Sequence, residues 1–139
     1  MQMPRMTKRQ GKKIFYPELS YLINGFLYKI HNRLGRFRNE KQYTDALEQI
    51  FRENDINYQR EIPLPQSFKG ERAGRNVPDF IIDDEIILDI KSKRLITKED
   101  YYQMRRYLTS YKKKLGIIVN FRQLSLAPKR VLNTELLNK

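Results

Sequence analysis

Two apolar segments separated by three acidic residues constrain the fold of this chain more than any other feature. Residues 77–82 and 86–91 are dominated by isoleucine, leucine, valine and phenylalanine, and Asp83, Asp84 and Glu85 lie between them. Short segments rich in β-branched residues that flank a polar cluster are typical of two antiparallel strands joined by a tight turn. The sequence therefore predicts a β-hairpin here.

The length of the turn decides which residues share a face of this hairpin. If three residues form the turn, Ile82 pairs with Ile86 and Asp79 lies directly opposite Asp89. A two-residue turn would place Asp79 opposite Leu88 and send it to the other face, because side chains alternate along a strand. With the three-residue turn one face is purely apolar, and the other carries Asp79, Ile81, Ile87, Asp89 and Lys91.

Helical patterns flank the hairpin on both sides. Apolar residues at three- and four-residue steps predict a helix over residues 17–34, which Gly35 ends, and a second helix over residues 40–54. Thr97 and Asp100 form a capping-box pattern that begins a third helix.

The remaining segments complete a single α/β domain. Strands are expected over residues 56–64, 115–121 and 129–132, and the basic segment 66–76 is expected to be a loop. The predicted organisation is a basic flexible arm over residues 1–15, one domain over residues 16–133 and a tail over residues 134–139.

Composition narrows the kind of site that this domain can hold. The chain of 139 residues contains no cysteine, which excludes disulfides and thiolate metal sites, and its single histidine, His31, argues against a structural zinc site or a histidine-based triad. Any metal must therefore be held by oxygen. No apolar run approaches the roughly 20 residues that cross a bilayer, so we expect a cytoplasmic protein that does not enter membranes.

The charge of the chain indicates its partner. Lysine and arginine number 28 against 16 aspartate and glutamate residues, for a formal net charge of +12. Such an excess is typical of proteins that bind phosphate backbones, although ribosomal and membrane-surface proteins share it. Nucleic acid is the expected partner, with DNA favoured over RNA, and a homodimer is possible for a domain of this size.

The facing carboxylates of Asp79 and Asp89 are the main candidates for chemistry. Two carboxylates at short distance repel, so they form either a metal site or a strained pair in which one pKa is raised. Mg²⁺ or Mn²⁺ suits such a site because it prefers oxygen ligands, and the main-chain carbonyl of Ile90 would add one more. Lys91 projects to the same side as Asp89 and places an ammonium beside the pair.

Glu40 is the third acidic candidate. It precedes Tyr43 by three residues and Leu47 by seven, so helical geometry predicts that its carboxylate lies on the buried edge of the second helix, where it could reach the metal directly or through water. The alternative is that Glu40 is an acid favoured in the first turn of a helix and nothing more.

These residues resemble a known family. The Pro78-Asp79 pair, followed at hairpin distance by Asp89 and Lys91, resembles the PD-(D/E)xK nuclease superfamily. A narrower resemblance links the chain to the small GxxExxY proteins of that superfamily, because Leu34-Gly35 followed by Glu40-Lys41-Gln42-Tyr43 resembles their naming motif. Phe37 stands where these proteins usually have a second glycine, and Asp89 replaces their usual glutamate.

The resemblance implies a fold and a set of roles. The fold is a restriction-endonuclease-like αβββαβ core with a mixed central sheet flanked by helices. Asp79 and Asp89 would bind the metal with support from Glu40, and Lys91 would orient the attacking water. Gln103 and Tyr107 match a QxxxY pair of RecB-like branches that lies against the active site.

A basic surface is expected to bind the nucleic acid. Its predicted members are lysines and arginines of loops and helices that are expected to be exposed: Arg36, Arg38, Lys69, Arg72, Arg75, Lys93, Arg105, Arg106, Lys112 and Lys113. Among the tyrosines of the third helix, Tyr101, Tyr102, Tyr107 and Tyr111 could stack on bases, although aromatic residues at helical spacing more often pack in a core. The function indicated is a metal-dependent nuclease; the alternatives are a nucleic-acid-binding module without turnover, as part of a larger complex, and a structural basic protein.

Overall fold

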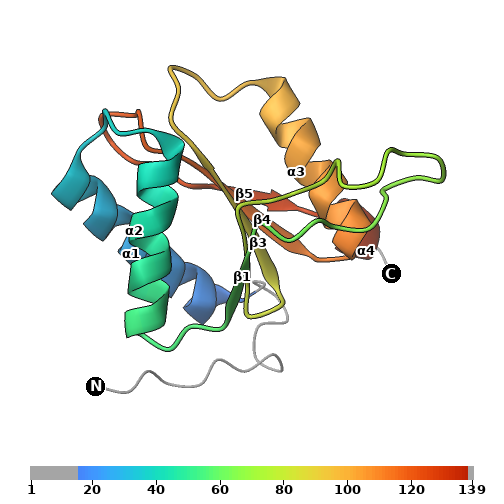
Figure 1. Cartoon of the computed structure of the whole chain (residues 1–139), viewed down its shortest axis with the longest axis horizontal. Coiled ribbons are helices and arrows are strands. Elements are labelled where there is room, and N and C mark those ends of the chain that lie inside the picture. The colour runs from blue at the N-terminus through green and yellow to red at the C-terminus, as the bar shows by residue number, and fades with distance from the viewer. Residues whose placement is uncertain (1–15, 138–139) are drawn as a thin grey trace.

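A mixed five-stranded sheet lies between two layers of helices in the computed structural model, which describes residues 16–137. Helices α1 and α2 cover one face of the sheet and α3 covers the other (Figure 1). The basic arm predicted over residues 1–15 lies outside the described residues. The elements in chain order are α1 (Pro17–Leu34), α2 (Glu40–Glu53), β1 (Tyr58–Arg60), β2 (Phe80–Ile82), β3 (Ile86–Lys91), α3 (Lys98–Tyr111), β4 (Leu115–Asn120), β5 (Lys129–Leu132) and α4 (Thr134–Leu137).

The strands are arranged in the order β1-β2-β3-β4-β5. Strands β3 and β4 are parallel, because α3 crosses over between them, and the other neighbouring pairs are antiparallel. The predicted α/β class and mixed central sheet are therefore confirmed. Of the helices in the described part of the chain, none combines the length and the apolar character needed to cross a bilayer.

The hairpin has the register expected for a three-residue turn. Ile82 pairs with Ile86 and Phe80 with Leu88. Asp83 and Asp84 in the turn both have positive φ angles, of 53° and 55°, a conformation that aspartate tolerates better than most residues. Asp79 consequently falls opposite Asp89, one residue beyond the last pair of the ladder.

Both faces of the hairpin are buried, each in its own apolar core. Phe80 and Leu88 belong to the core beneath α1 and α2, which also contains the stacked rings of Tyr43 and Phe121, 4.1 Å apart. Ile81 and Ile87, on the face that carries the two aspartates, pack in the smaller core beneath α3. The acidic pair therefore lies at the margin of an apolar layer rather than on an open sheet face.

Three elements differ from the sequence prediction. The strand expected over residues 56–64 is only Tyr58–Arg60, because Glu61 adopts a φ of 55° and two prolines follow. Strand β2 begins at Phe80 rather than at residue 77, since Pro78 has no N–H for a ladder hydrogen bond. In the predicted C-terminal tail, Thr134–Leu137 forms the short helix α4.

Candidate active site

Asp79 and Asp89 meet where the hairpin ladder ends. The backbone N–H of Asp79 donates to Oδ1 of Asp89 at 3.4 Å, and the N–H of Ile90 donates to Oδ2 of Asp79 at 2.6 Å. Asp89 is 6% exposed, and Asp79 is partly buried. The expected juxtaposition of the two carboxylates is present, and it depends on the three-residue turn.

The electrostatics of this pair favour an added positive charge. Burial, followed by the negative charge of Asp89, raises the pKa of Asp79 to about 8, while the hydrogen bond from Ile90 opposes the rise. Glu40 adds a smaller contribution in the same direction as Asp89. Asp79 therefore keeps a proton at neutral pH when no cation is nearby, and a divalent cation would relieve the same repulsion.

The main-chain carbonyl of Ile90 is a third oxygen at this place. Extending the register from Phe80 and Leu88 by two residues puts Pro78 opposite Ile90. In that position a residue's N–H would normally bond to the facing carbonyl, but proline has no N–H. The N–H of Ile90 points to Asp79, and its carbonyl lies on the same side of the strand. Two aspartates and this carbonyl form a donor set that fits Mg²⁺ or Mn²⁺.

Lys91 contacts the pair of aspartates through Asp89. Its Nζ lies 2.8 Å from Oδ2 of Asp89 and donates to Oε1 of Gln103 at 3.0 Å. Burial acts to lower the pKa of Lys91, but the carboxylates of Asp89, Asp100 and Glu40 outweigh it, and the net pKa lies above the ordinary value. Lys91 is thus an ammonium at neutral pH and acts as a positive charge rather than as a proton acceptor.

Glu40 is placed differently from the prediction. The side chain is exposed, so the expectation of a buried edge is wrong: the first residue of α2 projects beyond the end of the sheet. Its Oε2 accepts a hydrogen bond from the N–H of Ser92 at 3.3 Å, while Ser92 Oγ donates to the carbonyl of Arg38. Glu40 is close enough to act on Asp79 electrostatically. Within residues 16–137, however, no three histidine, cysteine, aspartate or glutamate side chains are grouped tightly enough to hold an ion by themselves.

Gln103 and Tyr107 lie one helical turn apart on α3 and face the sheet. Gln103 contacts Lys91, as described above, whereas the Tyr107 hydroxyl donates to the carbonyl of Val77 at 3.3 Å. Tyr107 is 4% exposed, and burial together with the charges of Asp89 and Asp79 raises its pKa well above the usual range. Its neutral ring packs in the core directly behind the acidic pair.

A pocket of about 300 Å³ opens beside Lys91 and Gln103. Asp100, Tyr102 and Arg106 of α3 also line it. Asp100 was anticipated only as a helix cap, yet its carboxylate binds the Nζ of Lys93 at 2.6 Å and lies 3.9 Å from that of Lys91. Its burial would raise its pKa, but hydrogen bonds from Lys93 and Thr97 lower it below the ordinary value. The sequence feature that points to this pairing is that Lys91 and Lys93 shortly precede Asp100, the acid of the capping box.

The predicted basic surface divides into separate parts. Arg105 and Arg106 are exposed on α3 near the pocket, and Lys69, Arg72 and Arg75 are exposed on the segment between β1 and β2. Two predicted members are half-buried and contact other residues of the protein: Lys93 pairs with Asp100, and the Nε of Arg36 donates to the carbonyl of Arg122 at 2.8 Å. Arg38 is exposed and its Nε donates to the carbonyl of Leu34.

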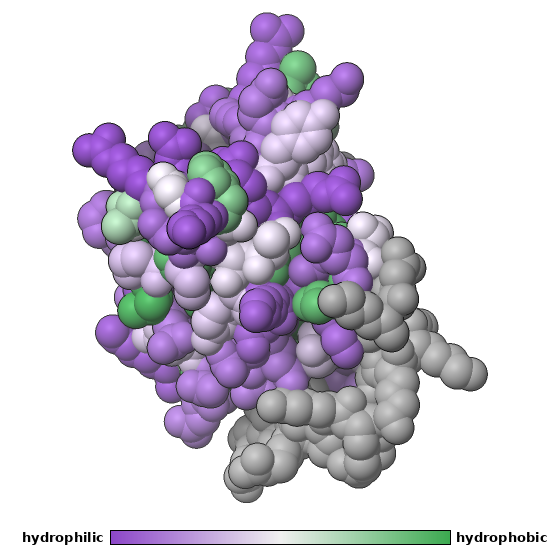
Figure 2. All heavy atoms as spheres, turned by 90° about the vertical axis from the view of Figure 1, so that its right-hand side faces the viewer, coloured by the Kyte–Doolittle hydropathy of each residue, from purple (hydrophilic) through white to green (hydrophobic). Residues whose placement is uncertain are grey.

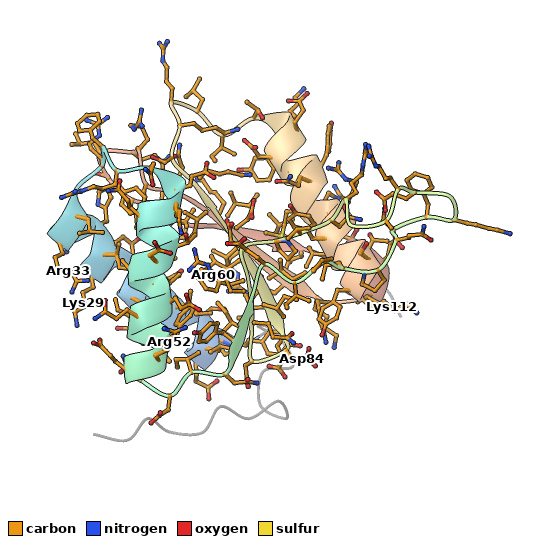
Figure 3. The ribbon with its side chains drawn as sticks, viewed as in Figure 1. Lys29, Arg33, Arg52, Arg60, Asp84 and Lys112 are labelled. Carbon is orange, nitrogen blue, oxygen red and sulfur yellow. The ribbon has the colours of Figure 1, made fainter. Side chains whose placement is uncertain are left out.

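Lys112 and Lys113 lie away from the acidic pair. Lys113 Nζ is 3.6 Å from Oδ2 of Asp84 in the hairpin turn, which is the opposite end of β3 from Lys91. Figure 3 shows Asp84 and Lys112 at this end of the molecule. The two lysines therefore do not border the pocket.

The fold, with paired aspartates and a lysine at the ends of its central strands, is that of a nuclease-like domain. Comparison with known proteins supports this class. Residues 17–131 match the sequence profile of the PD-(D/E)XK nuclease superfamily. The chain belongs to this superfamily. The narrower resemblance to GxxExxY proteins stays a prediction from sequence.

Two solved structures share the fold. The crystal structure of SSO0001 has a TM-score of 0.52 at 22% identity, and the match covers 83% of this chain and 57% of that one. The alkaline exonuclease LHK-Exo from Laribacter hongkongensis has a TM-score of 0.51 at 13% identity, covering 83% of this chain and 71% of that one. This chain thus spans little more than half of the first protein. No curated protein matches it.

Proposed function

We propose that this protein is a metal-dependent nuclease that hydrolyses phosphodiester bonds, with DNA as the favoured substrate. The observation that supports it best is the group formed by Asp79, Asp89 and Lys91, in which two facing carboxylates, with the pKa of Asp79 raised, adjoin a fixed ammonium. Membership of a nuclease superfamily supports the same function. Cytoplasmic location and homodimer formation stay predictions from sequence.

Asp79, Asp89 and the Ile90 carbonyl would hold Mg²⁺ or Mn²⁺, with Glu40 acting through water. The bound ion would supply a Lewis acid that lowers the pKa of a water molecule and offsets charge on the phosphate. Lys91, kept protonated by its carboxylate neighbours and oriented by Gln103, would position the water and stabilise the negative charge that develops on the phosphate oxygens. Tyr107 keeps the region behind the aspartates apolar.

One observation favours a second function, nucleic-acid binding without turnover. Oδ2 of Asp89 is already neutralised by Lys91 at 2.8 Å, so the site is complete as an internal ion pair. A protein of this kind would use its basic surface for binding within a larger complex and would have no need of a metal.

Cleavage assays separate the two functions. Linear DNA, circular DNA and RNA would be incubated with the full chain in Mg²⁺, in Mn²⁺ and in EDTA. We expect cleavage only with metal, and loss of cleavage in Asp89→Asn. The matched control is Asp55→Asn, which changes an exposed acid at a φ of 55° that asparagine also adopts. If Asp89→Asn cleaves as fast as the parent, the proposed site is wrong. If neither protein cleaves and both bind, the second function is correct.

A further inference from the structure

A second pocket continues the first along the outer side of α3. It has a volume of about 450 Å³ and is lined by Phe68, Arg105 and Thr109, and it shares Tyr102 and Arg106 with the pocket beside Lys91. The two pockets therefore adjoin and form one hollow, here called the α3 groove. Its other wall is the segment between β1 and β2, which runs across to the α3 side of the sheet (Figure 1).

Two exposed aromatic rings lie along this groove. Tyr102 is 55% exposed and Phe68 is 61% exposed, and neither belongs to the two apolar cores of the described chain. Of the four tyrosines of α3, Tyr102 alone is exposed; Tyr107 is buried, and Tyr101 and Tyr111 pack against the core beneath α3. Side chains of this kind add nothing to the core, but they suit stacking on an unpaired base.

Phe68 is held in place by buried polar contacts. Glu71 is 4% exposed, and its Oε1 accepts hydrogen bonds from the N–H and the hydroxyl of Ser67, at 2.6 and 2.7 Å, and from the amide of Asn76 at 2.9 Å. Ser110 of α3 donates to the carbonyl of Pro65 and ties the segment to the helix. The wall that carries Phe68 is thus preorganised relative to α3, which lowers the entropic cost of binding a ligand.

The charge of the second pocket suits phosphate. Arg105 and Arg106 are exposed, and within residues 16–137 neither forms an ion pair with a carboxylate, while Glu135 is the one acid of the lining. Lys69 and Arg72 are exposed cations on the segment that carries Phe68, although they do not line the pocket. On the face of the molecule that Figure 2 shows, hydrophilic residues predominate and apolar ones occur in small separate patches. That surface lacks the large apolar patch typical of a protein-binding site.

We infer that the α3 groove binds an unpaired strand of nucleic acid, with bases stacked on Tyr102 and Phe68 and phosphates against Arg105 and Arg106. An unpaired strand is required because bases within a duplex stack on each other and do not offer their faces to side chains. The groove ends at the pocket of Lys91 and Gln103, so the strand leads to the candidate active site. That last step rests on the proposed function; strand binding itself does not.

Binding in EDTA tests the inference without catalysis. The probe is a fluorescein-labelled oligothymidylate, compared by anisotropy with a blunt-ended DNA duplex of equal length, in which every base is paired. Tyr102→Ala and Phe68→Ala should each weaken oligothymidylate binding by about 5- to 100-fold, whereas Tyr102→Phe should keep most of the affinity. The matched control is Tyr21→Ala, which removes a tyrosine that is 83% exposed on α1, in the other layer. Binding of the blunt-ended duplex should change little in any of these variants.

Salt dependence gives a second, independent measurement. Replacing Arg105 and Arg106 by glutamine should flatten the slope of log affinity against log salt by about 0.7 for each phosphate contact that is lost. The inference is overturned if Tyr102→Ala and Phe68→Ala bind oligothymidylate as tightly as Tyr21→Ala, or if the duplex and oligothymidylate lose affinity equally. Failure of the proposed function looks different: metal-dependent cleavage would be absent while binding in the groove persists.

Discussion

The ammonium of Lys91 lies 2.8 Å from Oδ2 of Asp89, two residues earlier on the same strand. Because both side chains leave the same face of β3, the lysine occupies part of the space in which a cation on Asp89 would lie. The ammonium of Lys91 and a bound metal ion would compete for the carboxylate of Asp89. Loss of the lysine should therefore raise metal affinity while it lowers the rate of catalysis.

Lys91→Met should therefore bind Mn²⁺ more tightly than the parent and cleave about 100- to 1,000-fold more slowly, since a charge that stabilises the transition state is gone. Calorimetric titration with Mn²⁺ and a cleavage assay at saturating metal measure the two effects. Lys29→Met is the matched control, because Lys29 is exposed on the outer side of α1 (Figure 3). Weaker Mn²⁺ binding in Lys91→Met would show that the lysine does not compete with the metal.

The pKa of Asp79, raised to about 8 by burial and then by the charge of Asp89, makes the stability of the metal-free protein depend on pH. Unfolded aspartate titrates near pH 4, so between about pH 4 and pH 8 the native state binds more protons than the unfolded state. The contribution of Asp79 to the free energy of unfolding is therefore fully present below about pH 4 and is lost as the pH rises through 8.

We expect the Tm in EDTA to fall from about pH 6 to pH 8.5 more steeply for the parent than for Asp79→Asn, which has no proton to lose at this position. Saturating Mg²⁺ should reduce the fall, because a cation between the carboxylates replaces the proton. Differential scanning calorimetry measures both. Parallel Tm curves for the parent and Asp79→Asn would refute the assignment of this titration.

The hairpin shows how far sequence reasoning reaches in this protein. Its register follows from the alternation of side chains and from the turn length, so the meeting of Asp79 and Asp89 was predictable. The exposure of Glu40 was not, because periodicity gives the face of a helix but not whether its first residue projects past the sheet. The contact of Asp100 with Lys93 depends on the path of the connection between β3 and α3, which has no periodic signal. The α3 groove is likewise formed by an irregular segment.

Gln103 is expected to position Lys91 rather than to act on substrate. Gln103→Ala removes the acceptor at 3.0 Å from Nζ, and we expect kcat to fall about tenfold with KM nearly unchanged and a stability loss of about 1 kcal/mol. Gln103→Glu keeps an acceptor at this place and should recover most of kcat. Steady-state kinetics on one labelled substrate measure these values. If Gln103→Glu is as slow as Gln103→Ala, the glutamine has another role.

Tyr107 is expected to matter for its ring and not for its hydroxyl. The hydrogen bond from Tyr107 to the carbonyl of Val77 is long, at 3.3 Å, so Tyr107→Phe should lose about 1 kcal/mol or less of stability and keep most of its cleavage. Tyr107→Ala leaves a cavity beneath α3 and should lose about 3 kcal/mol or more. Urea unfolding together with the cleavage assay tests both. A large loss of kcat in a stable Tyr107→Phe would instead assign the hydroxyl to the reaction.

Pro78 faces Ile90 across the end of the hairpin, where any other residue would present an N–H to the carbonyl. Pro78→Ala supplies that N–H, and a hydrogen bond to the Ile90 carbonyl would compete with the metal for the same oxygen. We expect several-fold weaker Mg²⁺ binding, a kcat close to that of the parent at saturating Mg²⁺, and a change in stability within about 1 kcal/mol. Pro63→Ala, at an exposed proline, controls for the loss of a rigid residue. Unchanged Mg²⁺ affinity in Pro78→Ala would show that the Ile90 carbonyl is not a ligand, and the proline would then serve only to end the ladder.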